Sequence, residues 1–277
     1  MQGNFQIDAQ TYHPDEALGI TDSALAGKTF RMNAFGDIKY SIGKFRAGLR
    51  YEAYLPPIAG YDQQYEGTGI PYWFAEYAGN QLQVTVGHFF EQFGSGLILR
   101  SYEQWDLGYD NNYNGVRVKY NPIAGIFLKG LVGTQRDYWH SFEDDNRGIV
   151  RALDAEFVLN DVFKKMETTK TRFILGGSFV SKYEKVAQKT LVVDTTIYAY
   201  NLPANVAAYA GRLTITNGGF NFNTEYVYKY NNPSAFNNYI YKEGQALLAT
   251  LSYSLKGLGI ILSGKRIDNM SYKSKMT

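Results

Sequence analysis

Hydrophobic and polar residues alternate along most of this chain with a period of two, the pattern of β-strands whose successive side chains point to opposite faces. In residues 44–54, for example, apolar and aromatic residues occupy the odd positions, and Arg46, Arg50 and Glu52 lie between them. No segment with helical periodicity is longer than two turns. The pattern predicts thirteen strands, at residues 4–11, 29–41, 44–54, 71–78, 81–90, 115–120, 125–135, 152–159, 171–182, 209–216, 220–230, 244–254 and 258–267.

The connections between these predicted strands alternate in length. Gly and Asn, which tolerate the positive φ of tight turns, mark short connections at 41–43, 79–80, 121–125, 217–219 and 255–257. Long connections fall between them at 13–28, 55–70, 91–114, 136–146, 183–204 and 231–243, and the link 160–170 is intermediate. In outer-membrane barrels short turns face the periplasm and longer loops face outside, so the alternation favours such a barrel.

The two faces of the predicted strands differ in polarity. One is apolar and has tyrosines near the strand ends, where aromatic girdles meet the membrane interfaces; these are Tyr40, Tyr51, Tyr120, Tyr228 and Tyr230. The other carries charges of both signs, which suit a wet or plugged interior better than a packed core. The residues predicted to face the lumen are Arg46, Arg50, Glu52, Arg117, Lys119, Asp154, Glu156, Arg212, Asn221 and Glu225.

We therefore predict an all-β fold, an antiparallel up-and-down transmembrane β-barrel in one domain over residues 1–277. The predicted role is an integral outer-membrane protein in contact with the lipid bilayer, either structural or pore-like. The alternative is a soluble glycan-binding β-sandwich, whose polar face meets water and whose apolar face packs on a second sheet.

Composition narrows the functional classes further. The chain has no Cys, which excludes disulfide scaffolds, thiol catalysis and thiolate zinc sites. Its 28 basic and 26 acidic residues give a net charge of +2, too balanced to indicate nucleic acid as a partner. No apolar run approaches the ~18 residues of a transmembrane helix.

An odd number of strands raises the question of the sheet edges. Single-chain bacterial barrels have an even number of strands, and unpaired strand edges are not tolerated in lipid. We expect either a portion of a larger barrel or edges that another outer-membrane protein occupies, as in an assembly or secretion complex or a part-folded client. A miscounted strand, with 97–102 as the additional one, is the third interpretation.

The most distinctive local feature is the run from Glu91 through Gln92 and Phe93 to Gly94, Ser95 and Gly96. Clustered glycines within a strand pattern mark a bulge or a close backbone approach. We favour a structural kink where strand gives way to loop. The alternative is a constriction or inward-folded loop lined by Glu91, Gln92 and Arg100.

No cofactor, metal site or catalytic residue is expected. Residues 110–115 match the first half of a calcium loop, but its twelfth position is Asn121 rather than Glu, which favours an ordinary Asn/Gly-rich loop. Residues 143–146 are expected to form a solvated acidic loop. No Ser lies in a G-x-S-x-G motif, and Ser95 and His88 would lie ~23 Å apart if they shared one strand.

The long connections are rich in aromatic residues. Such residues could stack on glycans, form a protein interface or belong to the upper girdle. They are Tyr61, Tyr65, Tyr72, Trp73, Tyr102, Trp105, Tyr109, Tyr113, Tyr138 and Trp139.

Several segments resemble a Bacteroidota outer-membrane β-barrel family of unassigned function. Residues 3–10 and 48–56 are similar to its opening, and the strongest similarity lies in residues 86–100 (VGHFFEQFGSGLILR), 107–111 and 115–120. The similarity covers about residues 1–160, and the remainder shares only the strand pattern. The resemblance implies a barrel in the outer membrane and a chain that corresponds to the N-terminal portion of longer members. It implies no activity and no functional residues.

Overall fold

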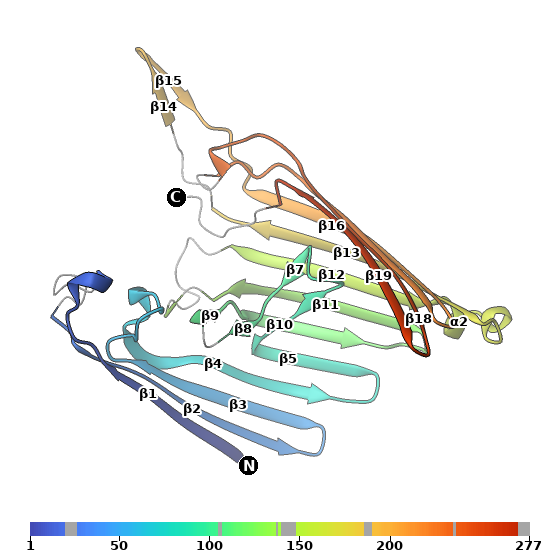
Figure 1. The fold of residues 1–277 in the computed structure, drawn as a ribbon, viewed down its shortest axis with the longest axis horizontal. Helices are drawn as coiled ribbons and strands as arrows, with labels where there is room; N and C mark the ends of the chain where they lie inside the picture. The colour runs from blue at the N-terminus through green and yellow to red at the C-terminus, as the bar shows by residue number, and fades with distance from the viewer. Residues whose placement is uncertain are drawn as a thin grey trace.

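The fold is one antiparallel sheet of thirteen strands, in which every strand pairs with its neighbours along the sequence (Figure 1). The computed structural model describes residues 1–19, 27–104, 107–136, 138–139, 148–185, 190–234 and 237–270. The strands are β1 (Gln2–Thr11), β2 (Phe30–Ile42), β3 (Phe45–Tyr54), β4 (Gly67–Ala78), β5 (Leu82–Phe89), β10 (Tyr113–Tyr120), β11 (Ile126–Gln135), β12 (Ile149–Val158), β13 (Thr171–Tyr183), β16 (Asn205–Asn217), β17 (Phe220–Lys229), β18 (Gly244–Leu255) and β19 (Leu258–Asp268). The predicted up-and-down all-β fold is confirmed.

Each predicted strand corresponds to one strand of this sheet. The segment 97–102 adds no strand to it, because its two-residue strand β7 (Leu99–Arg100) pairs with β6 (Gln92–Phe93) outside the sheet. Strand β4 begins at Gly67, four residues before its predicted start. Two glycines and Pro71 interrupt the alternating pattern at the start of β4, so the sequence does not indicate it. The register between β3 and β4 shifts beside Pro71, which has no N–H to donate to the ladder.

The predicted alternation of short and long connections is also present. Between β12 and β13 the chain forms α2 (Leu159–Val162) and a 3-10 turn, η4 (Lys164–Met166). The long connections contain the strand pairs β8 (Glu103–Gln104) with β9 (Tyr109–Asp110) and β14 (Thr190–Val193) with β15 (Thr196–Ala199), and the 3-10 turns η1 (Glu16–Leu18) and η2 (Gln63–Tyr65). None of the helices in the described ranges is long and apolar enough to span a membrane.

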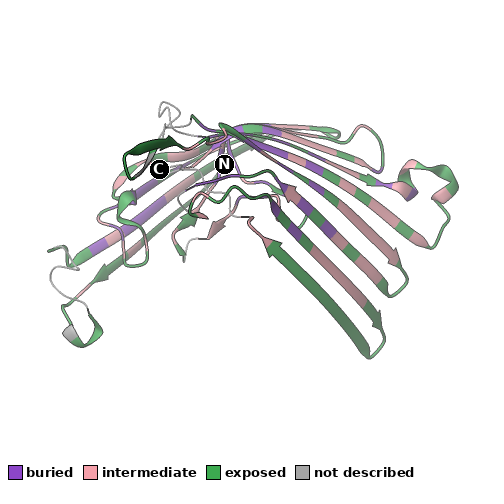
Figure 2. Ribbon diagram, turned by 90° about the horizontal axis from the view of Figure 1, so that it is seen from above, coloured by how far each residue is buried: buried purple, intermediate pink, exposed green. Residues whose placement is uncertain are grey.

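The sheet buries its polar face and exposes its apolar face. In Figure 2 it is an arch that opens to one side, and buried and exposed residues alternate along its strands. On β12, Leu153 is 62% exposed, whereas the adjacent Asp154 on the other face is 6% exposed. The same inversion separates exposed Phe5, Ile38, Leu49, Val86, Val116, Leu175, Tyr226 and Leu247 from buried Arg50, Glu52, Glu76, Thr85, Arg117, Ser178 and Glu225.

The soluble-sandwich alternative requires a second sheet that covers the apolar face. The residues that the structure describes contain, besides the main sheet, three pairs of short strands, and none of these provides such a layer. At the two sides of the main sheet, β1 and β19 each pair along one edge within the described chain.

Candidate functional site

Between β5 and β10, residues 90–104 and 107–112 fold onto the polar face of the sheet, and we call them the inner loop. Figure 1 shows β7, β8 and β9 of this loop lying across the sheet rather than extending beyond its end. The interpretation of residues 91–96 as a simple kink at a strand end is therefore wrong, and the structure has the inward-folded loop.

A small apolar cluster holds the inner loop against the sheet. Phe93, at 0% exposure, and Leu99 pack among side chains that point inward from β5, β10, β11, β12 and β13: Phe89, Tyr113, Leu131, Val150, Ala152 and Val180. Leu97 and Ile98 contact a second group, Ala210, Val227 and Ala246, on β16, β17 and β18. Removing these apolar side chains from water stabilises the inward-folded loop.

Glu91 is an ionic anchor at the start of the inner loop. Its carboxylate lies 2.9 Å from Lys119 Nζ and 3.1 Å from Lys129 Nζ, and Arg117 Nη1 is 3.4 Å away. Burial raises the pKa of the Glu91 carboxyl, but the hydrogen bonds and charges of the two lysines outweigh burial and hold the pKa below its ordinary value. The stability that this anchor contributes is therefore present at neutral pH and is lost as the pH falls through that lowered pKa.

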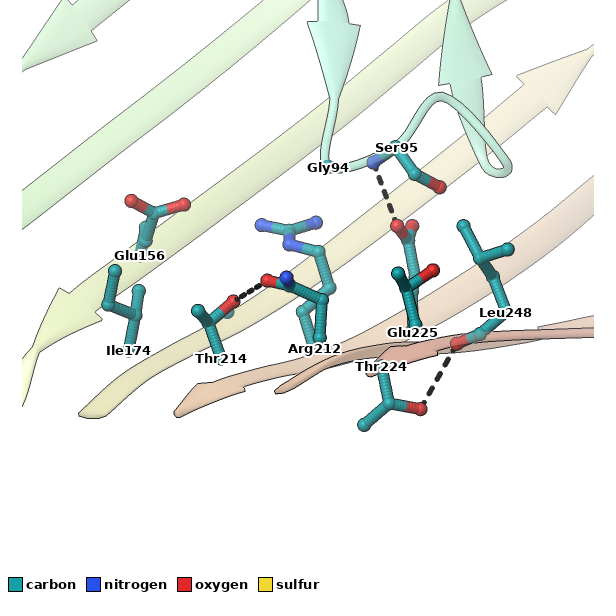
Figure 3. A pocket seen from close by; sticks show the side chains of 12 residues that line it. Gly94, Ser95, Glu156, Ile174, Arg212, Thr214, Thr224, Glu225 and Leu248 are labelled. Atoms are coloured by element: carbon teal, nitrogen blue, oxygen red, sulfur yellow. Dashed lines mark hydrogen bonds between the residues drawn. The ribbon is translucent and has the colours of Figure 1, made fainter. Parts of the chain in front are cut away.

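The tip of the hairpin β6–β7 docks on β17 (Figure 3). The backbone N–H of Ser95 donates a hydrogen bond to Glu225 Oε2 at 2.8 Å. Gly94 has φ +52°, and a Cβ atom there would lie 2.5 Å from Arg212 Cδ and 2.8 Å from Glu225 Oε2. Glycine is thus required at position 94 for two reasons: the backbone is left-handed there, and the chain approaches the sheet closely.

A second ionic cluster ties the end of the inner loop to the sheet. Arg50 binds Glu52 at 2.8 Å and Asp110 at 2.8 Å and also pairs with Glu103. Arg136 binds the same Glu52 and Asp110, at 2.7 and 2.6 Å. Two guanidinium groups therefore share the carboxylates of Glu52 on β3 and Asp110 on β9, and such pairing is how buried charges are tolerated in proteins.

This cluster also accounts for the calcium-like motif. Asp110 Oδ2 accepts from both guanidinium groups, and its Oδ1 accepts from the backbone and side chain of Asn112. The carboxylate is thus held by protein donors. The described residues contain no group of three or more His, Asp or Glu side chains that could hold a metal ion.

A cavity of about 340 Å³ lies beside the hairpin tip, on the polar face. The Arg212 side chain extends from β16 across β13 and passes over Gly176. A Cβ atom on Gly176 would lie 2.6 Å from Arg212 Nε. The Arg212 guanidinium donates to Asp154 at 2.6 Å and to Ser178 at 2.5 Å. Figure 3 shows Glu156, Arg212 and Glu225 around the space beneath Gly94 and Ser95. The remaining lining residues are Ile174, Gly176, Thr214, Asn223, Thr224, Leu248 and Thr250.

Most of the polar residues predicted to face the lumen lie in one of three places: the ionic anchor around Glu91, the cluster of Arg50 and Arg136, and the cavity beside the hairpin tip. Outside them, Arg100 lies over the Tyr102 ring, with 4.4 Å from its Cζ to the ring centroid, and Asn221 donates to Thr216. Gln92 donates its side-chain amide to Gly94 O. Arg46, which is half exposed, pairs with Glu76 on the neighbouring strand.

Sequence reasoning missed Glu76, Glu103, Lys129 and Arg136. Glu76 and Lys129 lie in strands that are apolar on most positions of both faces, but both follow the period of two and could have been assigned to the polar face. Arg136 is one residue beyond its strand, and Glu103 lies in a long connection. Neither position carries a periodic signal.

Four of the ten aromatic residues predicted for the long connections form a cluster inside the arch. Tyr61, Tyr65, Tyr138 and Trp139 pack on Phe35 and Tyr54, and the Trp139 indole N–H donates to Tyr65 O at 2.6 Å. They are therefore neither girdle residues nor freely exposed ligand contacts. Trp105, His140 and residues 143–146 lie outside the described residues.

His88 has a structural environment. It is 8% exposed, and its Nδ1 lies 3.2 Å from Trp73 N and 3.1 Å from Trp73 O. Ser95 lies at the hairpin tip and not on β5 with His88.

The profile of a family of unknown function, DUF6029, matches residues 1–277. The chain belongs to this family. A comparison of the DUF6029 chain with curated proteins found no match.

Several outer-membrane proteins of known structure resemble this DUF6029 chain. A loop L8 deletion mutant of OmpT from Vibrio cholerae is 14% identical, with a TM-score of 0.41 over 91% of this chain and 77% of that one. OpdK from Pseudomonas aeruginosa is 10% identical, with a TM-score of 0.38 over 91% and 75% of the two chains. A BenF-like porin from Pseudomonas fluorescens is 11% identical, with a TM-score of 0.34 over 96% and 92%.

The docking of the hairpin tip can be tested with Gly94→Ala. The added methyl group would collide with Arg212 and Glu225, so we expect the tip to lift and the Ser95 amide to exchange hydrogen about tenfold faster or more. Hydrogen exchange of the detergent-folded protein measures this.

Gly43→Ala is the matched control, because Gly43 has φ +55° and nothing within 4 Å of an added Cβ atom. It carries the same left-handed backbone cost of ~1–2 kcal/mol but leaves the tip in place. Equal exchange at Ser95 in both variants would contradict the docking.

Proposed function

We propose that this DUF6029 chain forms the wall of an outer-membrane β-barrel with a polar lumen, which the inner loop narrows. The observation that carries the proposal is the inverted burial of the sheet, with exposed Leu153 beside buried Asp154. In water this arrangement would leave a large apolar surface in contact with solvent, at a cost of ~25 cal/mol per Å². In a bilayer the same surface meets lipid, and the charged face meets the lumen.

The dimensions of the strands support a membrane wall. The sheet strands contain 8 to 13 residues each, and a tilted strand of ~9–11 residues crosses a bilayer. The outer face also carries exposed Tyr40, Tyr51, Tyr120 and Tyr230 near the strand ends, as interfacial girdles do. The location that follows is the outer membrane of a Gram-negative bacterium, and the sequence resemblance supports a member of the Bacteroidota.

The proposed role is pore-like, with the inner loop as its constriction. The polar side chains predicted from the sequence to face the lumen line the concave face, and the loop lies across that face and is held by Glu91, Ser95 and Asp110. The proposal includes no catalytic step.

A second candidate role concerns the edges of β1 and β19 that have no partner strand among the described residues. Unpaired backbone N–H and C=O groups cost several kcal/mol each in lipid, so in a membrane both edges require further strands as partners. Strands of another outer-membrane protein, as in an assembly complex, would satisfy them by β-augmentation. The observation that favours this role is that each of the two strands is paired along one edge within the described chain.

The membrane position of the apolar face is tested by Leu153→Arg. Leu153 lies near the middle of β12 on the apolar face, where an arginine near the bilayer midplane costs ~2–4 kcal/mol. We expect the free energy of unfolding in lipid vesicles, measured with denaturant, to fall by that amount.

Leu107→Arg is the matched control, since Leu107 is 63% exposed, as Leu153 is at 62%, but lies in the inner loop. A surface substitution of this kind changes stability by within ~0.5 kcal/mol. If the two variants lost equal stability, Leu153 would be facing water and the proposal would be wrong.

The pore-like role is tested by conductance in planar bilayers. We expect the protein, purified from the outer membrane with the strands that pair with β1 and β19, to conduct ions. Gly94→Ala, which releases the hairpin tip, is expected to conduct more than the unmodified protein, while Gly43→Ala is not. Absence of conductance from all three proteins would overturn the pore-like role, and equal conductance would overturn the role of the tip as a constriction.

A further inference from the structure

The cavity beneath the hairpin tip combines carboxylates with a small apolar surface. Glu156 from β12, Arg212 from β16 and Glu225 from β17 line it, together with the aliphatic side chains of Ile174 and Leu248 (Figure 3). Its volume, about 340 Å³, is within the ~300–1,000 Å³ of small-molecule pockets.

The charge around this cavity is negative. The Arg212 guanidinium is engaged by Asp154, at 2.6 Å. The carboxylate of Glu156, which is only partly buried, forms no hydrogen bond or ion pair with any residue in the described ranges. With Glu225, the group contains three carboxylates and one guanidinium, a formal net charge of −2.

Glu225 is incompletely paired although it is 4% exposed. Its Oε2 accepts the Ser95 N–H, whereas its Oε1 receives no hydrogen bond from the described residues. A buried carboxylate oxygen without a donor is costly, and its charge is screened less than that of a carboxylate exposed to water. A cation in the cavity would offset that cost.

We propose that this cavity binds a small organic cation, with an ammonium or guanidinium group and a short aliphatic segment. The Glu156 carboxylate accepts from the cationic group, Glu225 stabilises it through space, and Ile174 and Leu248 contact the aliphatic segment. The inference goes beyond the proposed barrel, which it uses only to place the cavity in the lumen.

One cation on a strand beside the cavity is Lys265 on β19. It is paired in register with Leu248, and its side chain is not among the cavity lining. Lys265 forms no ion pair with Glu156 or Glu225 among the described residues.

Calorimetric titration of the detergent-folded full chain with agmatine tests the proposal. Agmatine carries both a guanidinium and an ammonium group on a four-carbon chain, and glucose and glutarate serve as neutral and anionic probes. We expect agmatine to bind, more weakly at higher salt because charges are screened, and we expect no binding of glutarate. Glu156→Gln is expected to weaken agmatine binding ~10-fold or more, and Glu225→Gln to weaken it as well.

Glu167→Gln is the matched control, an equal change of charge in the turn after η4, far along the strands from the hairpin tip. It is expected to leave agmatine affinity unchanged. Absence of agmatine binding, tighter binding of glucose, or equal affinity of the Glu156 and Glu167 variants would overturn the proposal. Because the titration needs no bilayer, its failure is distinguishable from failure of the Leu153→Arg test.

Discussion

The whole structure depends on one constraint: a single curved sheet must match a different environment on each of its faces. No second layer within the described residues covers the apolar face, so the side chains on that face require a nonpolar medium. The opposite face carries charges that lie inside the arch, and many of them, such as Glu52, Arg117 and Glu225, are buried. Those charges are tolerated because carboxylates and cations are paired, either across strands, as Asp154 is with Arg212, or between loop and sheet, as Glu91 is with Lys119 and Lys129.

The inner loop satisfies this constraint on the concave side. Its apolar residues Phe93 and Leu99 cover the inward-facing apolar positions of five strands, and its backbone and acidic groups pair with sheet residues. The loop therefore replaces the packed core of a soluble β-protein with a thin layer that closes part of the interior. Beside that layer the packing is incomplete, and there the Glu225 carboxylate remains partly unpaired next to an open cavity.

The sequence predicts the sheet well because alternation is a local signal, repeated in every strand. Local signals fail where Gly or Pro interrupts them, as at the start of β4, and where a strand is only two residues long, as in β6 and β7. The path of the inner loop depends on contacts between distant residues, such as Ser95 with Glu225. Phe93, Leu97 and Leu99 were nevertheless a usable signal, because three large apolar residues in a supposedly solvated connection indicate burial. The partners of Asp110 could not be predicted, since Arg136 lies just beyond a strand and carries no periodic pattern.

Tryptophan quenching by phospholipids with brominated acyl chains tests the central claim most directly. Trp73 is 42% exposed on the apolar face of β4, opposite Leu49, whereas Trp139 lies inside the arch against Tyr54 and Tyr65. Two variants that each retain one of these tryptophans, with the others replaced by Phe, report on the two faces separately. The inverted sheet predicts strong quenching of Trp73 and weak quenching of Trp139 in vesicles. Equal quenching of the two, or none for Trp73, would contradict it.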